Sequence, residues 1–436
     1  MSPTDLVALV CCDLGSIVRG RSLLASELDG ALSAGVGWVP ANHALTPVGS
    51  LAEPNPFGST GDLRLLPDLD TRVRVGAGPG ATALEFVICD IVGTDGAPWD
   101  CCPRRFLRAV LEELEKLDIR VITSFEHEFQ LVSDAPPALP FSLAAQRASE
   151  PFATDVMEAL VEAGVEPERY FPEYASHQFE IPVDVAEGIA GADRSVVFKE
   201  VVREIAHRHS LHATFTPLLD PAEAGNGVHI HLSLLDGEGR ALLYDPQRPA
   251  ALSQLGGRFA AGILRHARAL GALTAPSPVS GARLAPHHWS AGALCLGERN
   301  REALLRIPPL VSLAGADPAG QLRLEYRGAD AAANPYLALG AVLRAGLAGL
   351  SGELPAPPIL DRDPARLDAA EAERFGLGAL PTSLADALAA LADDDTAAGW
   401  LGGPLHDAYL AVKHTELRAS AGMELREVCD RYAAIY

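Results

Sequence analysis

The feature that most constrains the fold is a ten-residue stretch, 225–234, which reads Gly-Asn-Gly-Val-His-Ile-His-Leu-Ser-Leu. After its second glycine, apolar and polar side chains alternate with the two-residue period of a half-buried strand. Such a strand places His229, His231 and Ser233 on one face, with the two imidazoles about 7 Å apart. A stretch of this kind more often forms an edge strand with two solvated histidines. The rest of the chain must therefore decide whether these residues share a functional cavity.

The composition excludes several classes of protein. The chain has 436 residues, enough for two domains, and its formal net charge of −22 argues against a surface that neutralises nucleic-acid phosphates. No run approaches the roughly 20 apolar residues of a membrane-spanning helix, and no secretory signal is recognisable. The seven cysteines include two adjacent pairs but no CxxC spacing, which disfavours a zinc site or a disulfide framework. We therefore expect a soluble, cytoplasmic protein with no nucleic-acid or membrane partner.

The distribution of turns and periodicities predicts two domains. Residues 1–98 hold extended stretches and a region rich in Gly, Pro and Asn, which is typical of a small β-rich domain. From Pro103 onward helical periodicity alternates with short strands, so residues 99–436 form the larger domain. There we expect an exposed excursion over 134–150, an irregular segment over 275–300 and a helical tail. The expected strands are 5–13, 17–23, 83–91, 119–123, 125–129, 178–181, 211–216, 228–234, 304–307 and 321–327, and the expected helices are 103–117, 153–163, 192–209, 250–270 and 335–350.

Three further motifs of the larger domain carry charged side chains. In Glu126-x-Glu128 and Arg323-x-Glu325-x-Arg327 the charged residues alternate with others as on one face of a strand, and Glu173 and Glu180 lie on the two sides of a turn. Each motif alone is more often a solvated strand face. Gathered on inward faces, however, the carboxylates would repel one another unless cations balanced them, and mostly oxygen ligands suit Mg²⁺ or Mn²⁺ better than zinc. Arginines beside such metals are what phosphates and carboxylates require, so the pattern predicts phosphoryl transfer from a nucleotide.

The order of these motifs resembles that of the glutamine synthetase superfamily, over nearly the whole chain. The motifs that carry the resemblance are Arg19-Gly20-Arg21, residues 61–68, Glu126-x-Glu128, Gln178-Phe179-Glu180, the Gly-x-Gly-x-His-x-His stretch, Arg299-Asn300-Arg301, residues 305–308, Glu325-Tyr326-Arg327 and Asn334-Pro335-Tyr336-Leu337. The resemblance implies an α+β fold, with a small N-terminal β-grasp domain followed by a catalytic α/β domain on a curved antiparallel sheet. It also implies a ring-shaped homo-oligomer, a dodecamer, with active sites shared between subunits. The implied reaction is phosphorylation of the γ-carboxylate of glutamate by ATP, followed by attack of an amine.

The resemblance further implies roles for individual residues. It implies two or three Mg²⁺ or Mn²⁺ ions per site, one bound by Glu128, Glu173 and Glu180 and another by Glu126, His229 and Glu325. The residues implied for substrate binding are Gly225, His231, Arg283, Arg301 and Arg327. Those implied for ATP binding are Glu168, Ser233, Arg306 and Arg323, and those implied for catalysis are Arg301, Arg323 and Glu325.

Two positions depart from the ammonia-using members of this superfamily. Where those members carry acids that bind ammonium, the aligned residues here are Val48 and Trp289, and Ala224 replaces an Asn that contacts glutamate in many members. An apolar pocket with an aromatic ring favours a larger amine, through hydrocarbon or cation–π contact. The chain therefore resembles the branch that joins glutamate to organic amines such as polyamines, ethanolamine, alkylamines or anilines. Two alternatives stay open: an ammonia-using glutamine synthetase, and a non-catalytic ring protein on the same fold.

Overall fold

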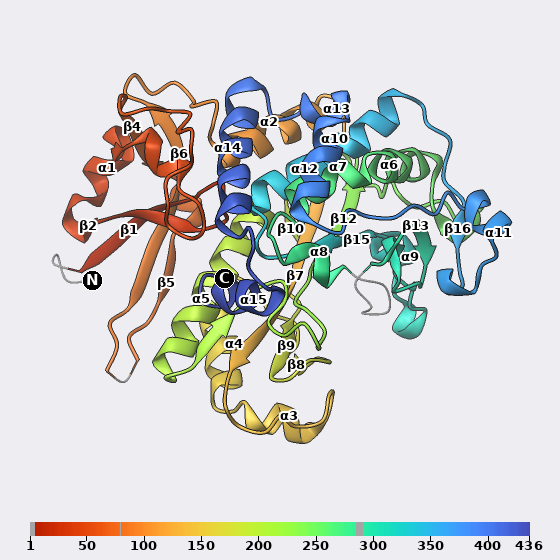
Figure 1. Ribbon diagram of the computed structural model, residues 1–436, viewed down its shortest axis with the longest axis horizontal. Helices are drawn as coiled ribbons and strands as arrows, with labels where there is room; N and C mark the ends of the chain where they lie inside the picture. The colour runs from red at the N-terminus through yellow and green to blue at the C-terminus, as the bar shows by residue number, and fades with distance from the viewer. Residues whose placement is uncertain (1–4, 79, 285–290) are drawn as a thin grey trace.

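The computed structural model describes residues 5–78, 80–284 and 291–436 (Figure 1). The first part of the chain builds a six-stranded sheet in the order β2-β1-β6-β4-β3, with β5 paired to β6. These strands are β1 Leu6–Cys12, β2 Val18–Leu24, β3 Val36–Trp38, β4 Leu63–Pro67, β5 Val73–Val75 and β6 Leu84–Gly93. One short helix, α1 Leu28–Ala34, interrupts the extended segments. The sequence therefore predicted the β-rich character of this part but not its helix.

The second part of the chain forms a ten-stranded sheet in the order β16-β13-β14-β15-β12-β7-β9-β8, and β10 and β11 also pair with β7. Its strands are β7 Arg120–Val132, β8 Phe171–Pro172, β9 Gln178–Ile181, β10 Ala186–Glu187, β11 His212–Thr214, β12 Val228–Leu235, β13 Ala293–Glu298, β14 Ala303–Ile307, β15 Leu324–Ala329 and β16 Ile359–Leu360. The sheet is antiparallel from β14 to β8, whereas β13 pairs parallel with β14 and β16.

Helices pack against this sheet and against one another. The longer ones are α2 Pro103–Glu115, α4 Phe152–Glu162, α5 Ala190–Arg208, α6 Gln254–Arg265, α7 Ala267–Thr274, α10 Pro335–Ser351, α12 Leu384–Ala392, α14 Gly403–Ala419 and α15 Leu425–Ala433. The short ones are α3 Leu143–Ala148, α8 Ser280–Arg283, α9 Pro318–Gln321, α11 Ala369–Arg374 and α13 Asp395–Ala398. Helix α10 is buried along most of its length and begins as predicted, because the Asn334 side chain accepts hydrogen bonds from the backbone N–H groups of Tyr336 and Leu337. Among the described residues no helix is long and apolar enough to cross a membrane.

The structure differs from the predicted elements in several places. The excursion expected over 134–150 contains α3, the strand expected over 321–327 begins only at Leu324, and the helical tail contains β16. The two strands expected over 119–129 are one continuous strand, β7. The helix expected over 250–270 is broken at His266 into α6 and α7. The segment 275–300, expected to be irregular, contains α8 and the strand β13. The prolines around this segment obscured the strand signal, since proline disfavours a regular ladder only at its own position.

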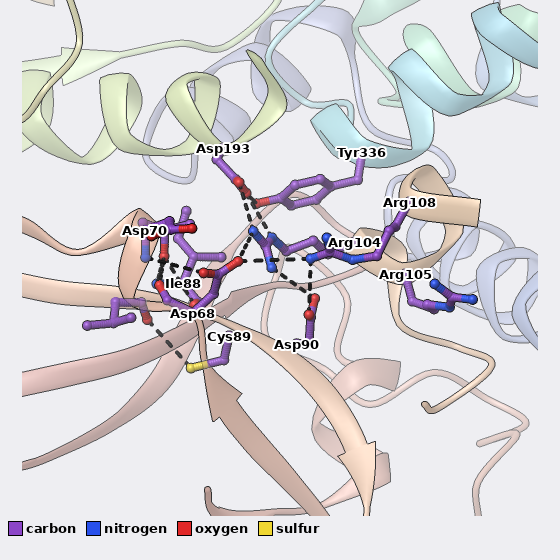
Figure 2. Close-up of polar contacts among 12 residues, drawn as sticks. Asp68, Asp70, Ile88, Cys89, Asp90, Arg104, Arg105, Arg108, Asp193 and Tyr336 are labelled. Atoms are coloured by element: carbon purple, nitrogen blue, oxygen red, sulfur yellow. Dashed lines mark hydrogen bonds and ion pairs between the residues drawn. The ribbon is translucent and has the colours of Figure 1, made fainter. Parts of the chain in front are cut away.

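One buried arginine forms ion pairs with carboxylates from both parts of the chain. Arg104, in the first turn of α2, is 3% exposed and is surrounded by three carboxylates (Figure 2). Its Nη2 lies 2.7 Å from Asp68 Oδ2 and its Nη1 lies 3.0 Å from Asp90 Oδ1, both on the N-terminal part. Its Nε and Nη2 each lie 2.9 Å from an oxygen of Asp193 on α5, which also accepts a hydrogen bond from the Tyr336 hydroxyl. Arg104 therefore links the N-terminal part to helices that pack on the ten-stranded sheet.

Candidate active site

The acidic and histidine motifs meet on one face of the ten-stranded sheet through its strand register. In the antiparallel pair β12–β7, His229 stands opposite Glu126, and in the pair β7–β9, Glu128 stands opposite Glu180. Residues two apart on a strand share a face, so both glutamates of the Glu126-x-Glu128 motif point to the same side. His229 Nδ1 lies 3.0 Å from Glu126 Oε2. The alternation seen in the sequence thus produces one acidic face with an imidazole at its centre.

The neighbouring strands add arginines to the same face. His231 stands opposite Glu325 across β12–β15, and Arg306 stands opposite Glu325 across β14–β15. Arg306 Nη1 lies 2.8 Å from Glu325 Oε2, and Arg327 donates a hydrogen bond to Glu325 Oε1. Arg323 lies just before β15, and its Nε donates to His231 Nδ1 at 3.1 Å. The face therefore changes along the sheet from carboxylates on β7 and β9 to arginines on β14 and β15.

Thirteen of the residues that the resemblance assigned to binding, metal ligation or catalysis line one cavity of about 800 Å³ at this face. They are Glu126, Glu128, Glu173, Glu180, Gly225, His229, His231, Arg283, Arg301, Arg306, Arg323, Glu325 and Arg327. The structure thus brings together residues that are widely separated in the sequence. Their roles in catalysis and binding stay predictions.

Three other candidates are not among the described residues that line the cavity. Ser233 follows His231 by two residues on β12, and its hydroxyl donates a hydrogen bond to the carbonyl of Leu322 at 3.2 Å. Glu168 is exposed and pairs with Arg169, which itself lines the cavity. Val48 belongs to the N-terminal part of the same chain and not to this wall. Trp289, the second residue predicted for the amine pocket, lies outside the described residues.

The carboxylates on the acidic side of the cavity are only partly balanced by cationic side chains among the described residues. Burial raises the pKa of Glu173 to about 8, and the nearby Glu128 carboxylate adds to the effect. Burial and the neighbouring carboxylate of Glu126 raise the pKa of Glu180 well above its usual range. Burial alone would also raise the pKa of Glu126, but the hydrogen bonds with His229 and His231 outweigh it and hold that pKa well below the usual range. An incompletely balanced group of carboxylates is the environment in which a divalent cation binds.

The donor atoms fit a divalent metal. Ligand atoms of Glu126, Glu180 and His229 lie within 4.8 Å of one another, and the same holds for Glu126, His231 and Glu325. Carboxylate oxygens dominate both groups, which suits Mg²⁺ or Mn²⁺. The second group contains His231 where the resemblance implied His229, although His229 Nδ1 is also only 3.7 Å from Glu325 Oε1. Both histidines therefore stand within reach of the same carboxylates.

On the basic side, Glu325 organises the arginines. Burial would raise its pKa, but His229 and Arg327 outweigh burial and bring the pKa of Glu325 to about 2. It therefore remains ionised and holds Arg306 and Arg327 in place. Arg301 is fixed through its backbone, because its carbonyl accepts a hydrogen bond from Arg327 Nε at 3.1 Å. An anionic group that enters the cavity would meet these guanidinium groups on one side and the carboxylates of β7 and β9 on the other.

Two glycines of the Gly-x-Gly-x-His-x-His stretch make room for Arg283. A Cβ on Gly225 would lie 2.1 Å from the carbonyl oxygen of Pro217 and 2.7 Å from Arg283 Cγ. A Cβ on Gly227 would lie 3.0 Å from Arg283 Nη1. The Pro217 carbonyl and the Arg283 side chain therefore leave no room for a Cβ at Gly225, and a Cβ at Gly227 would crowd the Arg283 guanidinium group.

Sequence reasoning assigned no role to the residues that join the loops of the cavity, although it included Gln178 in a motif. Gln178 Nε2 donates to the carbonyl of Gly225 at 3.0 Å and to Asn226 Oδ1 at 2.9 Å. Glu223 lines the cavity and accepts hydrogen bonds from the backbone and the hydroxyl of Ser176. Strand alternation could have identified Gln178, because it lies two residues before Glu180 on the same face of β9. No local signal marked the Glu223–Ser176 contact.

Comparison with known proteins places this site in a family. A model of the glutamine synthetase catalytic domain matches residues 100–427, and one of the glutamine synthetase N-terminal domain matches residues 1–99. The gamma-glutamylpolyamine synthetase GlnA3 of Streptomyces coelicolor (strain ATCC BAA-471 / A3(2) / M145) is 35% identical over 438 residues, covering 98% of this chain and 92% of the relative. The crystal structure of a novel glutamine synthase homolog matches with a TM-score of 0.93 at 46% identity, covering 100% of this chain and 99% of the other. A GmaS/ADP complex matches with a TM-score of 0.82 at 26% identity, covering 97% and 95% of the two chains.

The fold and the cavity of opposed carboxylates and arginines define an enzyme of a family that uses ATP and divalent metals. The chain belongs to the glutamine synthetase family, and it is a ligase of that family. The resemblance read from the motifs and the α+β class are thereby confirmed.

Proposed function

We propose that this protein is an ATP-dependent ligase that phosphorylates the γ-carboxylate of glutamate and joins it to an organic amine. The products are a γ-glutamyl amide, ADP and phosphate. One observation carries the choice of amine: the acids that bind ammonium in other members correspond here to Val48 and Trp289, while the carboxylates and arginines of the cavity are present in full. The similarity to a gamma-glutamylpolyamine synthetase supports the same choice.

Different residues of the cavity bind glutamate, the metal ions and ATP. Arg283, beside Gly225 and Gly227, receives the α-carboxylate of glutamate, and Arg301 and Arg327 receive its γ-carboxylate and the phosphoryl group. The carboxylates and His229 would hold two or three Mg²⁺ or Mn²⁺ ions, which would supply positive charge to neutralise the phosphates of ATP. Arg306 and Arg323 face the nucleotide phosphates.

The reaction has two covalent steps. An oxygen of the γ-carboxylate forms a bond to the γ-phosphorus of ATP, and ADP leaves. The amine nitrogen then attacks the acyl carbon, loses a proton to a carboxylate at the acidic side, and expels phosphate. Buried and positively charged surroundings stabilise the charge that develops on the transferring group.

The assembly belongs to the same proposal. The chain divides at residues 98 and 99 into a β-grasp domain and a catalytic domain, and subunits form a ring, a dodecamer, in the cytoplasm. Because Val48 does not line the cavity of its own chain among the described residues, it would complete the amine pocket of a neighbouring subunit. Mass measurement of the intact assembly tests the ring.

An amine panel tests the activity. ADP release is measured with glutamate, ATP and Mg²⁺ in the presence of ammonium, methylamine, ethanolamine, aniline, putrescine or spermidine. We expect kcat/KM for an organic amine to exceed that for ammonium, and Trp289→Glu to shift the preference toward ammonium. Best turnover with ammonium would instead identify a glutamine synthetase. Absence of Mg²⁺–nucleotide binding in calorimetry would favour a non-catalytic ring protein.

A further inference from the structure

The Arg283 side chain lines the cavity, and its guanidinium group is held by two backbone carbonyls. Arg283 is only 2% exposed, at the end of the short helix α8. Its Nη2 donates to two carbonyls at the end of β15, those of Gly328 (3.2 Å) and Ala329 (2.9 Å). Its Nε is buried and has no hydrogen-bond partner among the described residues. Its Nη1 points toward Gly227, on the cavity side.

A buried carboxylate stands directly behind this guanidinium group. Asp330 follows β15 by one residue and its side chain is completely buried. Its Oδ2 lies 3.8 Å from Arg283 Nε, a distance that an ion pair spans but a hydrogen bond does not. Its Oδ1 accepts the backbone N–H of Ala332 at 3.1 Å. Residues 328–330 thus surround the rear of the guanidinium group and leave Nη1 for a ligand.

Asp330 has no place in the chemistry described above. It is not among the described residues that line the cavity, so it cannot touch a substrate there. Its charge nevertheless favours the ionised form of Arg283, because it is the main influence that opposes the lowering of the Arg283 pKa by burial. A buried charge without a partner is costly, and removing one member of such a pair leaves the other uncompensated.

We propose that Asp330 is a positioning residue for the amino-acid substrate: its buried carboxylate compensates the charge of Arg283 and orients the guanidinium group so that Nη1 receives a carboxylate of that substrate. The inference rests on the proposed function, which assigns Arg283 to glutamate. It predicts that Asp330 affects the affinity for glutamate and leaves the affinity for ATP unchanged. ATP affinity is expected to be independent of Asp330 because Arg306 and Arg327 are held by the Glu325 carboxylate and not by Asp330.

The surroundings of Asp330 also predict a pH dependence. The charged groups that face it are Arg283 on α8 and Lys413 on α14, and the Lys413 ammonium pairs with Glu416 at 2.9 Å. Three tyrosines also face it and do not ionise near neutral pH, namely Tyr326, Tyr409 and Tyr436. Burial raises the pKa of Asp330 to about 6 despite Arg283. The KM for glutamate is therefore expected to rise as the pH falls through about 6.

The test uses the full-length protein with Asp330→Asn, which keeps the shape and the acceptor for Ala332. The matched control is Asp236→Asn, a buried aspartate just after β12 that pairs with Arg240 outside the cavity. We expect Asp330→Asn to raise the KM for glutamate at least tenfold, with the KM for ATP within twofold of the wild type. The control leaves both values unchanged. An unchanged KM for glutamate, or an equal rise in both KM values, would overturn the proposal.

A pH profile of the KM for glutamate and a calorimetric titration of glutamate test the role of Asp330 when the variant does not fold or the enzyme shows no turnover. If Asp330→Asn does not fold, the KM of the wild type for glutamate is followed from pH 7.5 to pH 5; a rise below about pH 6 that is absent for ATP supports the proposal, and a flat profile overturns it. If the wild type shows no turnover with any amine, the proposed function fails. Calorimetric titration of glutamate into wild type and Asp330→Asn then still tests the role of Asp330: weaker binding to the variant supports it, and equal binding overturns it.

Discussion

His229 and Glu126 face each other across β12 and β7, with Nδ1 of the histidine 3.0 Å from Oε2 of the glutamate. The same Oε2 lies 3.2 Å from His231 Nε2, so one carboxylate oxygen joins both imidazoles. Glu126 therefore stays ionised, whereas Glu180, which lies beside it, has a raised pKa. Glu180 on β9 therefore lacks the cationic partners that Glu126 has, and a metal ion is expected to bind on the β9 side of the cavity.

Mg²⁺ should stabilise the protein, and Glu180→Gln should weaken that effect. Without metal, the variant removes repulsion among buried carboxylates, so its melting temperature should equal or exceed that of the wild type. Mg²⁺ at a hundredfold excess over Kd should stabilise the wild type by about 2.7 kcal/mol, and the variant by less. Thermal unfolding with EDTA and with Mg²⁺ measures both quantities. The control is Glu187→Gln, an exposed partner of Arg120, which should change neither; no response of the wild type to Mg²⁺ would contradict the site.

Replacing Arg104 should destabilise the protein strongly. Arg104→Met leaves the carboxylates of Asp68, Asp90 and Asp193 without their buried partner, and we expect a loss of about 3–5 kcal/mol in the free energy of unfolding. Denaturant unfolding measures the loss. The neighbouring Arg105 pairs with Glu112 at the surface of the same helix, so Arg105→Met should stay within about 0.5 kcal/mol. Equal effects of the two substitutions would contradict a role for Arg104 in joining the two parts of the chain.

Acid should destabilise the protein through His43. This side chain is completely buried and neither ring nitrogen has a hydrogen-bond partner among the described residues. Burial lowers the pKa of His43 to about 3, below the 6.5 of an unfolded histidine. The unfolded state therefore binds more protons between these values, and stability falls by about 1.4 kcal/mol for each pH unit below 6.5.

Substituting His43 should remove that part of the acid sensitivity. His43→Leu loses no hydrogen bond, so its stability relative to the wild type should improve by about 2 kcal/mol between pH 7.5 and pH 5. Denaturant unfolding at the two pH values measures the change. The exposed His414 provides the control, since His414→Leu should show no such shift. A constant difference between His43→Leu and the wild type at both pH values would rule out the effect.

The sequence predicted which side chains share a face of a strand more reliably than it predicted which strands lie next to one another in the sheet. Alternation of side chains is a local property, so His229 and His231 could be assigned to one face from the amino-acid order alone. Strand order is not local: β12 lies between β7 and β15, which are distant from it in the chain on either side, and only the family resemblance linked them. The α+β class, which that resemblance implied, was confirmed by the family models and by the sheets of the structure.

Local alternation also has limits at the ends of strands. Ser233 continues the pattern of the two histidines, yet its hydroxyl bonds to the Leu322 carbonyl and does not line the cavity. Asp330 gave no signal, because an aspartate after a strand is ordinary in a turn and its burial depends on α8 and α14. Such residues are recognised only when the packing of distant elements is known.

Gly225→Ala should impair glutamate use without unfolding the protein. The added Cβ would lie 2.1 Å from the Pro217 carbonyl oxygen and 2.7 Å from Arg283 Cγ, so the loop and the arginine must move apart. Overpacking of this kind costs about 1–3 kcal/mol, which corresponds to a rise of roughly 5- to 150-fold in the KM for glutamate if it falls on the bound state. Steady-state kinetics with glutamate varied, and then with ATP varied, measure the effect.

The control for this substitution is Gly30→Ala on α1, where a Cβ would meet nothing within 4 Å. That variant should keep wild-type kinetics and be as stable as the wild type or more so, because alanine is favoured over glycine within a helix. Since the Gly225 substitution acts by displacing Arg283, combining it with Asp330→Asn should cost less than the sum of the two separate effects. Full additivity would mean that the loop and the carboxylate influence glutamate binding independently, and would argue against Arg283 as their common point of action.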